Sequence, residues 1–193
     1  NEEIISVERA IELFDIKDVG KSPAKFDLKK LSNLNSHYIQ QSDNNRLVSL
    51  IIPIIEDNLG ENIDENASER LKSGMPGLKE RAKDIIELAR SADFYASKRP
   101  IIKNPDAIHI LDGPNKVLLS SIQELLISIK NWTNDSLKEV ITNFSEEEKI
   151  KLGEVAKPLR AALTGKTVSP GIFEILTVLG KEESLGRIND VLI

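Results

Sequence analysis

The chain has 193 residues, of which 40% are hydrophobic and 30% are charged, and its formal net charge at pH 7 is −5. This balance is typical of a folded globular protein and is too apolar for a disordered one. The sequence contains no cysteine, which excludes disulfides and thiolate zinc sites. The negative net charge argues against a nucleic-acid partner unless basic residues gather in one patch.

The sequence also indicates where the protein works. No run approaches the roughly 18 apolar residues of a membrane-spanning helix, and the acidic start at residues 1–3 is unlike a signal peptide. We therefore expect a cytoplasmic protein without membrane contact, and we expect it to be a monomer. Because the chain does not begin with methionine, we also expect residue 1 to lie inside a longer natural chain.

Helical periodicity marks the first half of the chain. Ser6 is placed to cap a helix whose apolar stripe is Val7, Ala10, Ile11 and Phe14. Asp27 is placed to cap the next helix. The run Gly74-Met75-Pro76-Gly77 predicts a break that no helix crosses undisturbed. An amphipathic helix is then expected over residues 78–89.

The second half is also predicted to be helical. Two prolines and few apolar residues between 95 and 106 indicate irregular structure there, so we place a domain boundary near residue 96. Ser136 with Glu139, and Ser145 with Glu148, have capping-box spacing, which predicts a helix start at each serine.

No segment of useful length alternates apolar with polar residues, as a half-buried strand would. The predicted fold class is therefore all-α, with about ten helices. We expect two small helical domains in tandem, each a helical bundle or cage, over residues 1–96 and 97–193.

The stretch from Pro158 to Ile188 predicts a helix, a basic loop and two more helices. Gly165 is placed to end the first helix in a left-handed conformation, and Ser169-Pro170 has the composition of a helix start. An apolar stripe follows at helical spacing, formed by Ile172, Ile175, Leu176 and Leu179. Arg160, Lys166 and the free N–H groups behind Pro170 would then surround one short loop, which suits an anionic or polar ligand.

Local charge agrees with this interpretation. Between residues 149 and 174 the basic residues outnumber the acidic ones; they are Lys149, Lys151, Lys157, Arg160 and Lys166, against Glu154 and Glu174. The residues alone nevertheless favour a surface ion pair between Arg160 and one of these two glutamates over an RNA contact. Lys29 and Lys30 alone likewise indicate no more than a solvated helix face.

Residues 157–188, which read KPLRAALTGKTVSPGIFEILTVLGKEESLGRI, closely resemble the C-terminal end of bacterial glutamyl-tRNA synthetases. The family pattern is roughly PLR-ALTG---SPG-FE---LGKE---R, and it matches without a gap. The resemblance extends upstream to residues 26–31 with Tyr38-Ile39, and to residues 78–83. It therefore implies that the chain corresponds to the helical, tRNA-reading half of such an enzyme.

The resemblance assigns roles to particular residues. It implies that the anticodon contacts are Arg160, Lys166, Ser169, Pro170 and Ile172. It places Lys29, Lys30 and Asn35 in the part that contacts the tRNA stem. Gly74 and Met75 occupy the region where some discriminating relatives carry an arginine that reads the first anticodon base. Since no arginine is present there, we expect a parent enzyme that charges both glutamate and glutamine tRNAs with glutamate.

The resemblance also implies what the chain lacks. Neither a HIGH-like motif nor a KMSKS-like loop occurs, and there is no glycine-rich phosphate loop. We therefore expect no catalytic residue and no cofactor in this chain, with ATP and magnesium bound by the absent catalytic domain of a glutamate–tRNA ligase. His37 and His109, 72 positions apart, predict no metal site. The expected partner is tRNA. The alternative is a free-standing helical interaction module, derived from a synthetase, that does not bind RNA.

Overall fold

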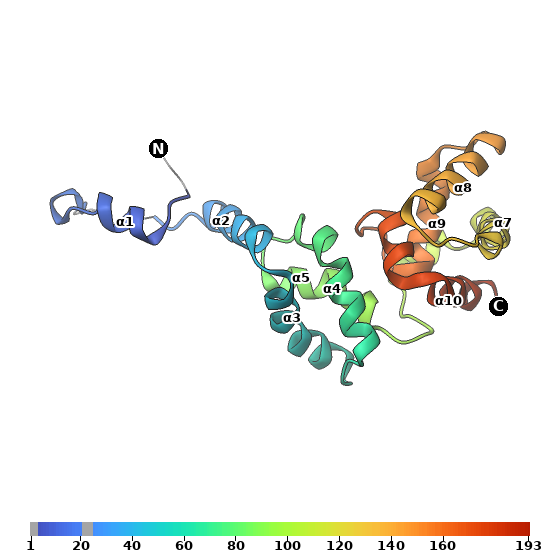
Figure 1. The fold of residues 1–193 in the computed structure, drawn as a ribbon, viewed down its shortest axis with the longest axis horizontal. Helices are drawn as coiled ribbons and strands as arrows, with labels where there is room; N and C mark the ends of the chain where they lie inside the picture. The colour runs from blue at the N-terminus through green and yellow to red at the C-terminus, as the bar shows by residue number, and fades with distance from the viewer. Residues whose placement is uncertain (1–3, 21–24) are drawn as a thin grey trace.

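A computed structural model describes residues 4–20 and 25–193, and these residues form helices and connecting loops without any strand (Figure 1). The prediction of an all-α chain with about ten helices is confirmed. In chain order the elements are α1 (Val7–Leu13), the 3-10 helix η1 (Ile16–Asp18), α2 (Leu28–Gln41), α3 (Asn44–Leu59), α4 (Glu65–Lys79), α5 (Ile85–Ala96), α6 (Pro105–Ile110), α7 (Pro114–Ser128), α8 (Asn134–Glu147), α9 (Leu152–Thr164) and α10 (Ile172–Leu192).

Short polar side chains begin most of these helices. The Ser6 hydroxyl accepts a hydrogen bond from the Arg9 N–H, and the Asp27 carboxylate accepts from the N–H groups of Lys29 and Lys30. Both caps agree with the sequence prediction. Each capping side chain accepts hydrogen bonds from N–H groups in the first turn, which have no partner within the helix. Thr133, rather than Ser136, caps α8.

The two predicted capping boxes are therefore wrong. Ser136 lies in the first turn of α8, behind Thr133, and Ser145 lies near the end of the same helix. The Ser145 hydroxyl donates to the Thr142 carbonyl one turn back instead of receiving an N–H. The spacing alone misled because serine can satisfy itself locally inside a helix.

The core extends across both halves of the chain. Helices α3, α4 and α5 pack against one another, and α9 and α10 pack together with α7 and α8; α4 also contacts α10, and α5 contacts α9. Buried apolar residues of all these helices form one cluster. The predicted boundary at residue 96 coincides with the last residue of α5. Division into two independent domains stays a prediction.

Helix α1 stands apart at one end of the molecule (Figure 1). The stripe predicted for its buried face is exposed: Val7 and Ile11 are each 71% exposed and Phe14 is 69% exposed. No residue of α1 is buried. Its apolar face is therefore formed as the sequence predicted, but nothing in the described chain covers it.

The predicted break at 74–77 is wrong. Helix α4 continues through Gly74 and Pro76 to Lys79, and the chain turns only at residues 80–84. The range 78–89, predicted as one helix, therefore contains the end of α4 and the beginning of α5, and Asp84 caps the start of α5. The physical reason is burial: Leu71, Met75 and Leu78 lie inward on one face of α4, and this packing outweighs the helix-weakening effect of glycine and proline.

Candidate nucleic-acid interface

The loop between α9 and α10 forms the corner that the sequence singled out. Gly165 ends α9 with φ +68°, a left-handed conformation that glycine adopts without strain, as predicted. The following helix begins at Ile172, later than predicted. Ser169 is not its cap, because the N-cap position is Gly171 and no side chain makes a capping bond there. The Ser169 hydroxyl instead accepts from Arg160 and donates to the Pro170 carbonyl.

Two arginines converge on Ser169. The Nε of Arg160, on α9, donates to the Ser169 hydroxyl at 2.8 Å. One guanidinium nitrogen of Arg81, in the turn after α4, donates to the Ser169 carbonyl at 3.1 Å. The corner is therefore built by segments from both halves of the chain.

The positive charge at this corner is not neutralised by a carboxylate. Neither Arg160 nor Arg81 forms an ion pair within the residues that the structure describes. Burial lowers the pKa of the half-buried Arg160, and the neighbouring positive charge of Arg81 lowers this pKa further. A half-buried Arg160 beside the exposed positive charge of Arg81 favours an anion or an acceptor-rich ligand between or beside them.

A small cavity of about 110 Å³ is lined by Arg81 and by Ser169, the residue that Arg160 also contacts. Its walls combine Arg81, Glu87 and Ser91 with apolar groups of Leu78, Ala82, Val168 and Pro170. Ile172 is 6% exposed, and lies in the core rather than at the surface. The corner thus offers hydrogen-bond donors at one side of an apolar recess, an arrangement that suits the edge and face of an unstacked base.

Lys166 is already engaged within the chain. Its ammonium group pairs with the Asp93 carboxylate at 2.5 Å and also donates to the Arg90 carbonyl. Both partners belong to α5, so this lysine joins the α9–α10 loop to the first half of the chain. Its predicted role in tRNA binding stays a prediction.

The residues predicted to contact the tRNA stem lie on α2. Lys29 and Lys30 have exposed side chains near its start. Asn35 faces the protein instead, because its amide nitrogen donates to the Lys83 carbonyl at 2.7 Å. Two further side chains of α2, Ser36 and Gln40, donate to the Ala82 and Glu80 carbonyls. Asn35 therefore helps to hold α2 against the turn that follows α4.

Gly74 and Met75, the predicted first-base position, are both buried. Met75 is 0% exposed, and a Cβ atom added at Gly74 would overlap the ring of Tyr95. The exposed residues of this stretch are Ser73 and Pro76. Gly74 and Met75 therefore present no surface to a base, and their assignment to first-base reading stays a prediction of the resemblance.

Sequence reasoning did not identify Arg81 as a site residue. It lies in the segment 78–83, which carries the resemblance, but its partner Ser169 is 88 positions away. No periodicity links two positions so far apart. One feature of the sequence could have indicated Arg81: it is a basic residue close to a predicted helix end, inside a segment that resembles the family.

Within residues 4–20 and 25–193, no group of three or more histidine or acidic side chains is placed to hold a metal ion. None of the described helices is long and apolar enough to cross a membrane.

A protein-family model of the anticodon binding domain matches residues 46–192. The chain belongs to the anticodon-binding domain family. This match includes Arg81, Arg160 and Ser169, and thus the whole corner. Relatives of the chain confirm its resemblance to glutamyl-tRNA synthetases.

Two bacterial relatives illustrate the similarity. The chain is 46% identical over 192 residues to glutamate–tRNA ligase 2 of Rhizorhabdus wittichii, covering 100% of this chain and 40% of that protein. It is 43% identical over 190 residues to glutamate–tRNA ligase 2 of Rhodospirillum rubrum, covering 98% of this chain and 41% of that protein. The chain thus spans about two fifths of the length of these relatives.

Solved structures agree on the fold. A glutamate–tRNA ligase from Elizabethkingia meningosepticum, crystallised with its amino acid, has a TM-score of 0.79 to this chain at 25% identity, covering 100% of this chain and 37% of that one. The glutamate–tRNA synthetase from Elizabethkingia anophelis has a TM-score of 0.76 at 23% identity, also over 100% and 37%.

Proposed function

We propose that this chain is the tRNA-recognition part of a glutamate–tRNA ligase, and that the corner of Arg81, Arg160 and Ser169 contacts the anticodon. One observation carries the proposal: two arginines from different halves of the chain converge on Ser169 without a carboxylate partner among the described residues. Family membership and the names of the relatives support the same role.

The chemistry of an anticodon suits this corner. Anticodon bases are single-stranded, so their edges and faces are open to side chains, whereas a duplex would hide them. The guanidinium groups can donate to base edges or phosphates, and Pro170 with Val168 provides an apolar surface for a base. Binding energy gained here would serve to position the acceptor end of the tRNA in the rest of the enzyme.

We further propose that the first anticodon base is read loosely. The absence of arginine at Gly74 and Met75, and the burial of both residues, support this idea. The parent ligase would then attach glutamate to both glutamate and glutamine tRNAs. ATP, magnesium and the catalytic residues would belong to the part of the ligase that this chain does not span.

The exposed apolar face of α1 is consistent with a chain that is part of a longer ligase. Val7, Ile11 and Phe14 present apolar surface of the kind that packs against another part of a longer protein. We propose that the catalytic part covers this face. Hydrogen exchange tests this idea: the α1 amides should exchange more slowly in a full-length ligase than in this chain, and equal rates would contradict it.

The experiment that tests the main proposal is a binding titration of this chain with glutamate tRNA, glutamine tRNA and an unrelated tRNA at two salt concentrations. We expect both of the first two to bind more tightly than the third, and affinity to fall with salt because phosphate contacts release counterions. Preference for glutamate tRNA alone would contradict loose reading of the first base.

A matched pair of variants locates the contact. Arg160→Met should weaken binding by about 1–3 kcal/mol if the guanidinium reads a base edge. Lys116→Met removes an exposed positive charge on α7 and should leave affinity nearly unchanged. Equal affinities of the two variants would remove Arg160 from the interface. No binding by the wild-type chain to either cognate tRNA would favour an interaction module without RNA binding.

A further inference from the structure

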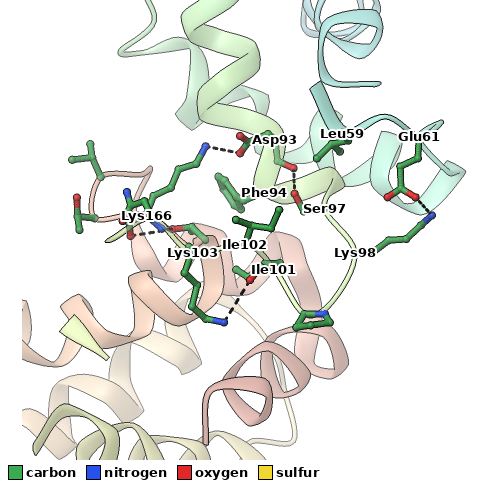
Figure 2. A pocket seen from close by; sticks show the side chains of 16 residues that line it. Leu59, Glu61, Asp93, Phe94, Ser97, Lys98, Ile101, Ile102, Lys103 and Lys166 are labelled. Atoms are coloured by element: carbon green, nitrogen blue, oxygen red, sulfur yellow. Dashed lines mark hydrogen bonds and ion pairs between the residues drawn. The ribbon is translucent and has the colours of Figure 1, made fainter. Parts of the chain in front are cut away.

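A larger cavity, of about 710 Å³, lies where the two halves of the chain meet (Figure 2). It is bounded by the end of α5, by the linker at residues 100–104 and by the loop at residues 164–168. Of its lining residues, only Lys166 and Val168 have been given a role in tRNA binding above.

Two large apolar side chains that line the cavity are exposed to solvent. Ile102 is 92% exposed and Val168 is 72% exposed. The linker that carries Ile102 is anchored at both sides, since Ile101 is 5% exposed and the Asn104 N–H donates to the Gly165 carbonyl at 2.9 Å. Ile102 is therefore a fixed apolar surface, and keeping it in water costs free energy in proportion to its area.

The charges around the cavity leave one cation without a carboxylate. Lys98 pairs with Glu61, and Lys166 pairs with Asp93, so these four charges cancel in pairs (Figure 2). Lys103 has only a long hydrogen bond of 3.5 Å to the Ile101 carbonyl, and no ion pair with any carboxylate that the structure describes. Lys103 follows Ile102 in the linker and lines the same cavity, and its ammonium group lies at the Ile101 carbonyl (Figure 2).

This cavity neighbours the anticodon corner through one shared residue. Val168 lines both this cavity and the smaller one beside Arg81, Ser169 and Pro170. A single strand whose bases lie against Ser169 and Pro170 would therefore carry its neighbouring nucleotide over Val168 and into the larger cavity.

We propose that this cavity is a second nucleotide subsite, which takes one unpaired nucleotide adjacent to the anticodon in the same tRNA loop. The base lies against Ile102 and Val168, and its phosphate lies at Lys103. This inference rests on the proposed function of the chain. Because every base has an apolar face, the subsite accepts different bases, and it adds affinity rather than sequence discrimination.

The test measures binding of an anticodon stem-loop RNA to the whole 193-residue chain. Ile102→Ser should weaken binding about threefold to tenfold, because it removes most of the apolar contact. Lys103→Met should weaken binding and reduce the slope of log affinity against log salt by about 0.7, the value for one phosphate of a single strand. Val117→Ser, at a valine on α7 that is 70% exposed, is the matched control and should bind as wild type does.

A second RNA series assigns the occupant. Stem-loops with one abasic nucleotide, placed in turn at each position flanking the anticodon, should include one RNA that binds wild type and Ile102→Ser equally. That result shows that Ile102 contacts the missing base. If Ile102→Ser weakens every abasic RNA to the same extent, no flanking base occupies the subsite and the proposal is overturned.

The outcomes separate this inference from the proposed function. If Arg160→Met loses affinity while Ile102→Ser and Lys103→Met bind as wild type does, the anticodon corner is supported and the second subsite is overturned. If the wild-type chain does not bind the stem-loop at all, the proposed function and this inference fall together. Thermal unfolding of each variant checks that the exposed substitutions leave the fold intact.

Discussion

Glu183 and Arg187, one turn apart on α10, form an ion pair in which Nε donates to Oε1 at 2.7 Å. The Arg187 side chain is fully buried, and burial lowers its pKa despite the neighbouring Glu183 carboxylate. Its other nitrogens donate to the carbonyls of Leu163, at 2.6 Å, and Ser97, at 3.2 Å. One arginine thus joins α10, α9 and the segment after α5.

Two more arginines share the same carboxylate. Arg99 lies 3.5 Å and Arg70 lies 3.7 Å from the Glu183 oxygens. Three positive charges around one negative charge make Glu183 the residue on which this junction depends. Since Arg70 belongs to α4 and Arg99 to the segment after α5, Glu183 also helps to fix how the two halves meet.

We predict that Glu183→Gln lowers the free energy of unfolding by about 3 kcal/mol, because a buried guanidinium then loses its counter-charge. Chemical denaturation measures the change. Glu182→Gln removes a charge from the exposed neighbouring residue, and its effect should stay within about 0.5 kcal/mol. Equal midpoints for the two variants would show that Arg187 is stabilised by the carbonyls alone.

Gly74 on α4 is predicted to be irreplaceable by alanine. An added Cβ would overlap the ring of Tyr95, which is 0% exposed. The overlap should cost more than the roughly 1 kcal/mol that alanine gains in a helix, giving a net loss of about 1–2 kcal/mol. Urea denaturation measures the change.

Gly153→Ala is the matched control for that variant. Gly153 lies in α9, and a Cβ atom there would meet nothing within 4 Å. The substitution should stabilise the chain slightly, by up to about 1 kcal/mol. A stabilising effect at both glycines would mean that Tyr95 has room to shift, and that larger side chains could fit at position 74.

The features that were predicted correctly are local ones. Asp27 was recognised as a cap and Gly165 as a helix end because each acts on groups only a few positions away. The course of α4 through Gly74 was missed because burial decides it, and burial depends on helices distant in sequence. The hydrogen bond from Arg187 to the Ser97 carbonyl joins positions 90 apart, and no local sequence pattern predicts such a contact.

The contacts of the candidate site also differ in how far they could be predicted from sequence. Arg160 and Ser169, nine positions apart, were placed on one loop from sequence, and they are in contact. Arg81 reaches the same serine from 88 positions away and was not foreseen. Lys166 was expected to face a ligand, but its pairing with Asp93 depends on how α5 lies against the loop.

Glu174 should make stability depend on pH. It lies on α10 and its Oε1 accepts from the Gly77 N–H at 3.1 Å. Burial raises the pKa of this carboxyl above its ordinary value of 4.5, and the hydrogen bond from Gly77 only partly opposes the shift. A raised pKa in the folded state means that the native chain holds the proton more tightly than the unfolded chain does.

The contribution of Glu174 is therefore complete below about pH 4.5 and is lost as the pH rises through its folded-state pKa. Glu174→Gln keeps an oxygen for the Gly77 N–H but cannot ionise. The unfolding temperature of this variant, relative to wild type, should rise as the pH is raised above 4.5. Thermal unfolding over a pH series measures it, and a difference that does not change with pH would contradict the prediction.

Asn35 and Lys29, both on α2 and both predicted to contact tRNA, should behave differently when replaced. The Asn35 amide donates to the Lys83 carbonyl, so Asn35→Ala leaves a polar group without its partner and should lower the free energy of unfolding by about 1 kcal/mol. Lys29 has an exposed side chain, so Lys29→Met should leave stability unchanged and weaken tRNA binding in a salt-dependent manner. Denaturation and tRNA titration of both variants separate the two roles. Weaker tRNA binding by a fully stable Asn35→Ala chain would instead assign Asn35 to the RNA interface, as the resemblance implies.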